Sequence, residues 1–255
     1  MATAKTYPGL FVMIDGLDGV GKDTIMEALK HMLIDKGKSV FELKSYWSNY
    51  GFHPELKDFV TSDVVMSSEP TSVGIGSAIR REIIANHTGR QYSARATANA
   101  YALDRLVLYK RVLLPALAVG KWITQSRGVS TSLAYQPLQA QTQQDSLPLE
   151  EVMALEGNVL ALENAPDLLI IPTVADVDEL ARRLASRQKK DDAIFENVPF
   201  QKQLKLVYES DSFRELFEKR GTIVRYFDAG VSVEHSRSEA VRILEEFLRA
   251  RGKIA

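Results

Sequence analysis

Short apolar runs alternate along this chain with longer segments in which apolar residues recur every three or four positions. The runs predict buried strands, at 10–15, 39–44, 64–68, 121–126, 167–174 and 221–229. The periodic segments predict helices, at 23–37, 75–86, 95–119, 150–163, 177–187, 200–219 and in a final segment with Val241, Leu244, Phe247 and Leu248 on one face. Alternation of this kind predicts a parallel sheet with helices on both sides.

Two stretches depart from the alternation. Residues 45–63 are aromatic and irregular, and we interpret them as an insertion or a short helix over the site. Residues 137–148 are polar and predict a loop. No repeat or linker divides the chain, so we expect one domain over 1–255.

Composition and charge narrow the function classes. The 255 residues carry a formal net charge of −1, which gives no reason to expect nucleic-acid or membrane binding. The chain has no cysteine, which excludes disulfides and thiolate metal sites and fits a reducing cytoplasm. No apolar run is long enough to span a bilayer or to serve as a signal peptide.

A phosphate-binding loop follows the first predicted strand. Gly16-x-x-x-x-Gly21-Lys22 lies between that strand and a predicted helix, which is the context the motif requires. Glycines let backbone N–H groups point at phosphate oxygens, and the lysine reaches the β- and γ-phosphates. The predicted ATP-binding residues are Gly16, Leu17, Asp18, Gly19, Val20, Gly21, Lys22, Asp23 and Thr24.

Further motifs resemble one family, the thymidylate kinases, which are P-loop kinases that phosphorylate dTMP. YALDR at 101–105 resembles the family's F-A-x-D-R, and SRGVSTSLAYQ at 126–136 resembles its D-R-Y-V-x-S-S-L-A-Y-Q. Glu69-Pro70 followed by GIGSAIR resembles its E-P-G-G-T…I-R segment. The resemblance runs from about residue 9 to 230. It implies a three-layer P-loop NTPase fold of the α/β class, with a parallel five-stranded sheet, helices on both faces and a small lid at about 187–198.

The resemblance also implies roles on the acceptor side. Tyr101 matches a Phe that stacks on thymine, and Arg105, one helical turn later, matches an Arg that donates to a base carbonyl. Arg127 matches the Arg that grips the transferring phosphates. The remaining residues implied to bind substrate are Glu69, Ser132, Tyr135 and Gln136.

One catalytic cation is expected from the lid. Members of the family carry an arginine either in the phosphate loop or in the lid, and this loop has none. Arg187 in ASRQKKDD therefore joins Lys22, Arg127 and Asp18 as a predicted catalytic residue, with Lys189 and Lys190 as alternatives.

Three positions break the family pattern. Asp23 replaces the metal-binding Ser or Thr, and Ser126 replaces the Asp of D-R. We expect these two to have exchanged roles, so that Asp23, Asp18 and Ser126 offer Mg²⁺ its oxygen ligands. Ser68 replaces an Arg that contacts the acceptor phosphate, and Arg80 or Arg81 is the expected substitute.

Three functions stay open at this point. The first is ATP- and Mg²⁺-dependent phosphorylation of dTMP to dTDP. The second is a kinase for another deoxynucleotide or for a nucleoside, and the third is a nucleotide-binding scaffold that has lost catalysis. The family forms homodimers, and the helix at 95–119 offers an apolar face for one (Leu106, Leu113, Leu117) that serves equally well as core.

Overall fold

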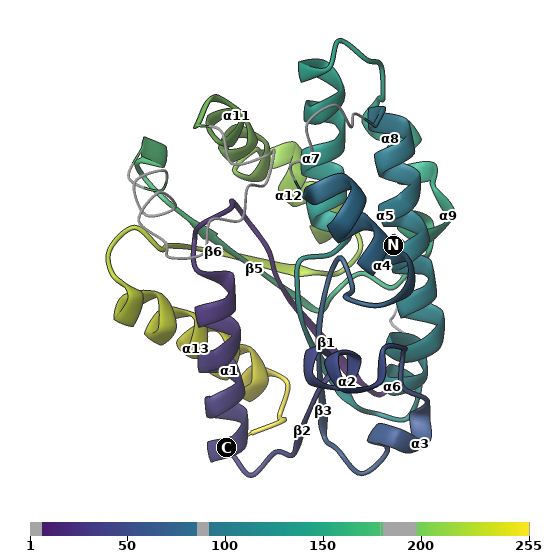
Figure 1. The fold of residues 1–255 in the computed structure, drawn as a ribbon. Coiled ribbons are helices and arrows are strands. Elements are labelled where there is room, and N and C mark those ends of the chain that lie inside the picture. The colour runs from purple at the N-terminus through teal and green to yellow at the C-terminus, as the bar shows by residue number, and fades with distance from the viewer. Residues whose placement is uncertain (1–6, 86–91, 179, 181–197, 255) are drawn as a thin grey trace.

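A six-stranded, fully parallel sheet runs through the molecule (Figure 1). The structure is a computed structural model that describes residues 7–85, 92–178, 180 and 198–254. The strand order is β2-β3-β4-β1-β5-β6. The strands are β1 Leu10–Ile14, β2 Val40–Glu42, β3 Val64–Ser68, β4 Trp122–Ser126, β5 Leu168–Thr173 and β6 Ile223–Asp228. The α/β class is confirmed, whereas the expected number of five strands is wrong. The five strands were implied by the resemblance, whereas the apolar runs predicted all six, including β2, a three-residue edge strand that pairs with β3.

Helices cover both faces of this sheet. In Figure 1, α1 and α13 lie together on one face, and α5, α7, α8 and α9 lie on the other. The α-helices are α1 Lys22–Asp35, α2 Leu43–Tyr50, α3 Leu56–Phe59, α4 Gly74–Ala78, α5 Ala94–Leu108, α6 Leu114–Ala118, α7 Val129–Thr142, α8 Leu149–Ala154, α9 Glu156–Glu163, α11 Val198–Tyr208, α12 Asp211–Glu218 and α13 Val233–Ala250. Wider, π-type turns follow α4 at Ile79–Ile84 and join α5 to α6 at Tyr109–Leu113.

The central strands of the sheet lie in the core. All residues of β1 and β3 are buried, because both strands have neighbours on each side and helices above and below. Continuous apolar runs are typical of such strands. No described helix is long and apolar enough to cross a membrane.

Several predicted boundaries change in the structure. The segment at 137–148 was expected to be a loop, but α7 continues through Pro137 to Thr142, because Leu138 and Ala140 are buried by neighbouring elements. The segment at 45–63 contains the short helices α2 and α3, and the buried side chains of Leu43 and Trp47 anchor α2 to the core.

Candidate active site

The phosphate loop joins β1 to α1, as predicted. Three of its glycines, Gly16, Gly19 and Gly21, have positive φ angles of 139°, 84° and 86°. These angles lie in the region that favours glycine. At Gly16 a β-carbon would also lie only 2.9 Å from the carbonyl oxygen of Pro172. The loop therefore needs glycine both for its backbone angles and for its close approach to β5.

Lys22 lies across this loop. Its Nζ donates to the carbonyl oxygens of Gly16, at 2.8 Å, and Leu17, at 2.6 Å. Burial and, after it, the nearby charge of Arg127 lower the pKa of Lys22 to about 7, against the opposing charge of Asp18. The ammonium group thus sits in a crowded, largely dry position at the centre of the loop.

Asp18 brings three of the predicted residues together. Its carboxylate accepts from Arg127 Nη2 at 2.5 Å and from Tyr135 Oη at 2.8 Å, and Lys22 Nζ lies 4.0 Å away. Burial alone would raise the pKa of Asp18, but Arg127 and Lys22 outweigh it and hold the pKa at about 2. A further partner, Gln201 of α11, accepts from the Asp18 amide and donates to its carboxylate, both at 3.2 Å.

Arg127 reaches Asp18 from an unusual backbone position. It follows β4 with a φ angle of 63°, and its amide donates to Ile14 O at 2.8 Å. A positive φ is uncommon for any residue other than glycine. The turn therefore points the guanidinium toward the phosphate loop while α7 begins at Val129.

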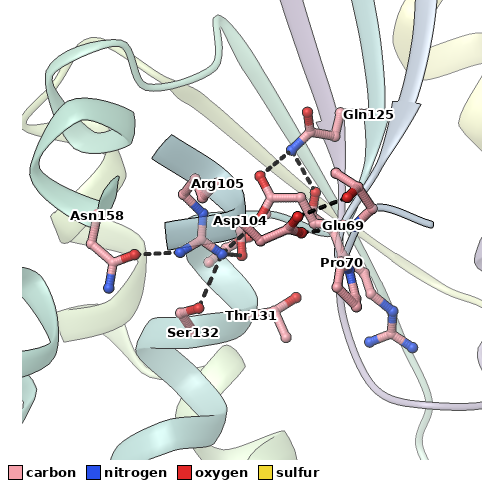
Figure 2. A network of polar contacts seen from close by, with 12 residues as sticks. Glu69, Pro70, Asp104, Arg105, Gln125, Thr131, Ser132 and Asn158 are labelled. Atoms are coloured by element: carbon pink, nitrogen blue, oxygen red, sulfur yellow. Dashed lines mark hydrogen bonds and ion pairs between the residues drawn. The ribbon is translucent and has the colours of Figure 1, made fainter. Parts of the chain in front are cut away.

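A second group of predicted residues surrounds Arg105 (Figure 2). Its side chain is 1% exposed, and Nη2 contacts Glu69 Oε2 at 2.7 Å and Ser132 Oγ at 3.0 Å. Nη2 also donates to Gly128 O at 3.0 Å, and Nη1 donates to Asn158 Oδ1 of α9. Among the described residues, Nε is left without a partner. Arg105 is therefore the centre of a buried network that joins β3, α5, α7 and α9.

Gln125 connects this network to the phosphate loop. Its Nε2 donates to Glu69 Oε1 at 3.0 Å and to Arg127 O at 2.9 Å. Burial raises the pKa of Glu69 to about 7; the charge of Arg105 opposes the rise and that of Asp104 adds to it. Glu69 and Arg127 are thus held by a common neighbour at the ends of adjacent strands.

Arg80 lies beside the segment that follows Glu69. Its Nε donates to Thr71 O at 3.0 Å, and its Nη2 donates to Pro70 O. Asp104 fixes the same segment by accepting from the Thr71 amide and hydroxyl, both at 2.7 Å. Of the two expected substitutes for the missing arginine, Arg80 is therefore the one beside Ser68–Thr71, whereas Arg81 donates to Ser77 O of its own helix.

Tyr101 and Gln136 complete the predicted acceptor side. Tyr101 is half-buried; burial raises its pKa, and the charges of Arg127 and Arg80 oppose the rise. Gln136 is buried; its Nε2 donates to Ser132 Oγ at 3.2 Å, and its Oε1 has no partner in the described part of the chain.

The three predicted metal ligands have different surroundings. The Asp23 side chain is 86% exposed, and its Oδ1 lies 3.0 Å from Lys44 Nζ of α2. Ser126 is buried at the end of β4, and the described residues contain no group of three or more acidic or histidine side chains that could hold a metal. The donor chemistry nevertheless fits Mg²⁺, which usually takes only one or two carboxylates and completes its shell with phosphates and water.

Sequence reasoning missed several residues of this site, and one prediction cannot be located. Arg187, with Lys189 and Lys190, lies outside the described residues. The missed residues are Asp15, Lys44, Asp104, Gln125, Asn158 and Gln201. Asp15 carried a signal, since a carboxylate directly after a buried strand lies at the edge where parallel strands end. Asp104 belongs to the YALDR motif, next to Arg105. The other four come from distant parts of the chain and have no local pattern.

Comparisons with known proteins bear on the fold and on these residues. A family model described as thymidylate kinase matches residues 54–237. Two curated relatives are called probable thymidylate kinase. The one from Caldivirga maquilingensis is 26% identical over 245 residues, with 96% of each chain covered. The one from Pyrococcus abyssi is 28% identical over 244 residues, with 94% of this chain and 98% of the relative covered.

A solved structure, that of thymidylate kinase from Candida albicans, has the same fold. It superposes on this chain with a TM-score of 0.62 at 18% sequence identity. The match covers 98% of this chain and 95% of the Candida albicans chain. The family model matches from beyond the phosphate loop, whereas both relatives align over more than nine tenths of this chain.

Proposed function

We propose, because this chain belongs to the thymidylate kinase family, that it transfers the γ-phosphoryl group of ATP to dTMP in a Mg²⁺-dependent reaction. The observation that carries the proposal is the Asp18 cluster, in which a phosphate-loop carboxylate is bound by Arg127 beside Lys22. The loop lysine and the arginine assigned to the transferring phosphates meet there within one network. Phosphoryl transfer needs this arrangement, since its catalysis is chiefly positioning and charge stabilisation.

On the donor side, the loop amides and the N-terminus of α1 bind phosphate oxygens. Lys22 supplies a positive charge at the loop, and the Arg127 guanidinium offers planar donors to the transferring group. Asp18 orients that guanidinium through the 2.5 Å contact. Negative charge that develops on the phosphoryl group is thereby met by cations already in place.

On the acceptor side, Tyr101 stacks on the thymine ring, and Ser132 and Gln136 line the base. Gln136 Oε1 is a buried acceptor without a partner among the described residues, so it suits an N–H group of the base. Arg105 offers its Nε as a donor to a base carbonyl, and its Nη2 holds Ser132 in place. Tyr135 lies against the sugar, and Arg80 binds the acceptor phosphate beside Glu69.

Mg²⁺ neutralises charge on the phosphates when it is bound. We assign its protein ligands to Asp23, Asp18 and Ser126, with phosphate and water completing the shell. Arg187 is proposed as the lid cation. We further propose that residues 1–255 form one cytoplasmic kinase domain that acts on small molecules and assembles as a homodimer.

An ADP-release assay with ATP, Mg²⁺ and a panel of acceptors tests the proposal. The panel contains dTMP, dUMP, UMP, dCMP, dGMP, dAMP and thymidine. Turnover with dTMP well above the rest is expected. Turnover with none of them, in protein that still binds ATP, would contradict catalysis and favour a nucleotide-binding scaffold.

A kinase for another deoxynucleotide or for a nucleoside is the second candidate. The observation that favours it is Ser68, whose buried hydroxyl stands where the family has a phosphate-binding arginine and has no partner in the described part of the chain. The same panel separates the two, because thymidine or a different monophosphate would then be the preferred acceptor.

A further inference from the structure

Asp15 is a completely buried carboxylate for which the proposed reaction has no role so far. It directly follows β1 and is 0% exposed. Its Oδ1 accepts from the Gly16 amide at 2.8 Å, and its Oδ2 accepts from the Thr131 hydroxyl at 2.7 Å and from the Ser130 hydroxyl. No salt bridge to it is formed within the described residues, so its bonds come from neutral donors.

These bonds join two pieces of the active site. Gly16 opens the phosphate loop, whereas Ser130 and Thr131 form the first turn of α7. The turn between β4 and α7 carries Arg127, whose amide bonds to Ile14 O, the residue just before Asp15. Both sides of the Arg127 turn are therefore tied to the end of β1, one by a backbone bond and the other by the carboxylate.

Burying a carboxylate costs free energy, so we expect Asp15 to do more than bind two hydroxyl groups. Two features explain why it is placed here. The N-terminus of a 14-residue helix favours negative charge, and α7 begins beside Asp15. The negative charge of Asp15 also acts on two cations of the site, since it raises the pKa of both Lys22 and Arg127.

We propose that Asp15 is a positioning residue for phosphoryl transfer, which holds the first turn of α7 against the phosphate loop so that Arg127 is correctly aimed. The inference rests on the proposed function and goes beyond it, because Asp15 contacts no substrate group and acts through Arg127. The backbone of Arg127 is then already fixed where its guanidinium bonds to Asp18. The Asp18–Arg127 contact at 2.5 Å follows from that fixed turn.

Asp167, which directly precedes β5, provides a matched control because it bonds to the other end of β1. It is a second buried aspartate, and its Oδ2 accepts from the Phe11 amide near the start of β1, at 2.8 Å. Asp15→Asn and Asp167→Asn are therefore the same change at opposite ends of β1. A purely structural carboxylate would behave alike at both ends.

The test is a double-mutant cycle with Arg127→Ala, measured as kcat and KM for ATP and dTMP. We expect Asp15→Asn to lower kcat by about tenfold to a hundredfold with KM for ATP changed less than about threefold, since a misaimed group chiefly affects the transition state. In the Arg127→Ala background the same change should alter kcat less than about threefold. Asp167→Asn should leave kcat nearly unchanged both in the unaltered protein and in the Arg127→Ala variant.

Amide hydrogen exchange gives a readout that needs no turnover. Asp15→Asn should speed exchange at residues 127–131, and Asp167→Asn should not. An equal loss of kcat with and without Arg127, or unchanged exchange at 127–131, would overturn the role of Asp15. Absence of turnover in the unaltered protein would instead overturn the proposed function, and the exchange measurement would still decide the inference.

Discussion

At the scale of single residues, the change with the largest consequence is the carboxylate in the phosphate loop. Asp23 faces solvent, and burial, which would raise its pKa, is outweighed by Lys44, which lowers it. An ionised carboxylate beside a triphosphate weakens binding by repulsion unless a cation stands between them. Mg²⁺ and Lys44 are the two cations available to fill that position.

The exchange of roles between Asp23 and Ser126 predicts a reciprocal rescue. Asp23→Ser should lower kcat/KM for MgATP by about tenfold to a hundredfold, because the metal loses its carboxylate. Adding Ser126→Asp should restore most of that loss. Steady-state kinetics across a range of Mg²⁺ concentrations measures both. If the double variant is as impaired as Asp23→Ser alone, the two residues do not share a metal.

Lys44→Met separates metal binding from simple charge neutralisation. The Lys44–Asp23 pair is exposed, so we expect a loss in ATP affinity of only about threefold that disappears at high salt. Equilibrium binding of ATP at two ionic strengths measures it. A large, salt-insensitive loss would show that Lys44, rather than the metal, is the partner on which Asp23 depends.

Glu69 predicts a dependence of stability on pH. Its pKa is raised from 4.5 to about 7 in the folded chain, so the folded state holds this proton more tightly than the unfolded state does. The resulting stability is complete below about pH 4.5 and is lost as the pH rises through about 7. Between pH 5 and 8 the free energy of unfolding should fall by on the order of 1–3 kcal/mol.

Glu69→Gln should remove that decline. Urea unfolding at pH 5, 6, 7 and 8 measures the slope, with Glu163→Gln on the exposed side of α9 as the control. A slope that is equally steep in Glu69→Gln and in the unaltered chain would assign the effect to another group.

At the scale of elements, α5 and α9 show what a local pattern can and cannot predict. The periodicity predicted both helices and placed Tyr101 and Arg105 on one face of α5. It gave no sign of Asn158, because the contact joins residues 53 positions apart. The loop expected at 137–142 was wrong for a related reason, since burial of Leu138 and Ala140 stabilises a helix that Pro137 alone disfavours.

Gly157 sets the separation between α5 and α9. A β-carbon there would lie 1.8 Å from Ala102 O, a backbone atom that cannot turn aside. Gly157→Ala should therefore destabilise the fold by about 1–3 kcal/mol. It should also raise KM for dTMP, because α9 carries Asn158 away from Arg105. Thermal unfolding and acceptor kinetics check both effects.

Gly230→Ala is the comparison for that change. A β-carbon at Gly230 would meet only the flexible side chain of Asp228, at 2.8 Å. We expect a smaller loss of stability and an unchanged KM for dTMP. An equal effect of both substitutions on that KM would contradict a role for the separation of α5 and α9.

At the scale of the whole molecule, the site forms where parallel strands end together. The register pairs Ile14 with Ser126 and Ser126 with Ser68, so the residues that follow these three strands must meet at one edge of the sheet. The alternation of strands and helices predicted this edge, and the motifs predicted the residues on it. The links between them, through Gln125 and Asp15, depend on side-chain packing and were not predictable from the sequence.

The apolar face expected to offer a dimer interface belongs largely to the core. Leu113 and Leu117 are buried within the chain, and only Leu106 is partly exposed. Leu113→Ala should destabilise the fold by about 2–5 kcal/mol without changing its mass in solution. Urea unfolding and analytical ultracentrifugation measure the two quantities. If the oligomeric state changes while the stability of the fold does not, Leu113 belongs to a dimer interface and not to the core.

The buried network around Arg105 also limits how the acceptor preference of this enzyme can be redesigned. Both terminal nitrogens of Arg105 are committed to four protein partners, namely Glu69, Gly128, Ser132 and Asn158, so replacing it would loosen the scaffold before it altered the choice of base. Among the described residues, Tyr101 and Gln136 make fewer polar contacts with the rest of the protein. A laboratory search for variants with a new nucleotide preference should therefore accumulate substitutions at those two positions while Arg105 stays invariant.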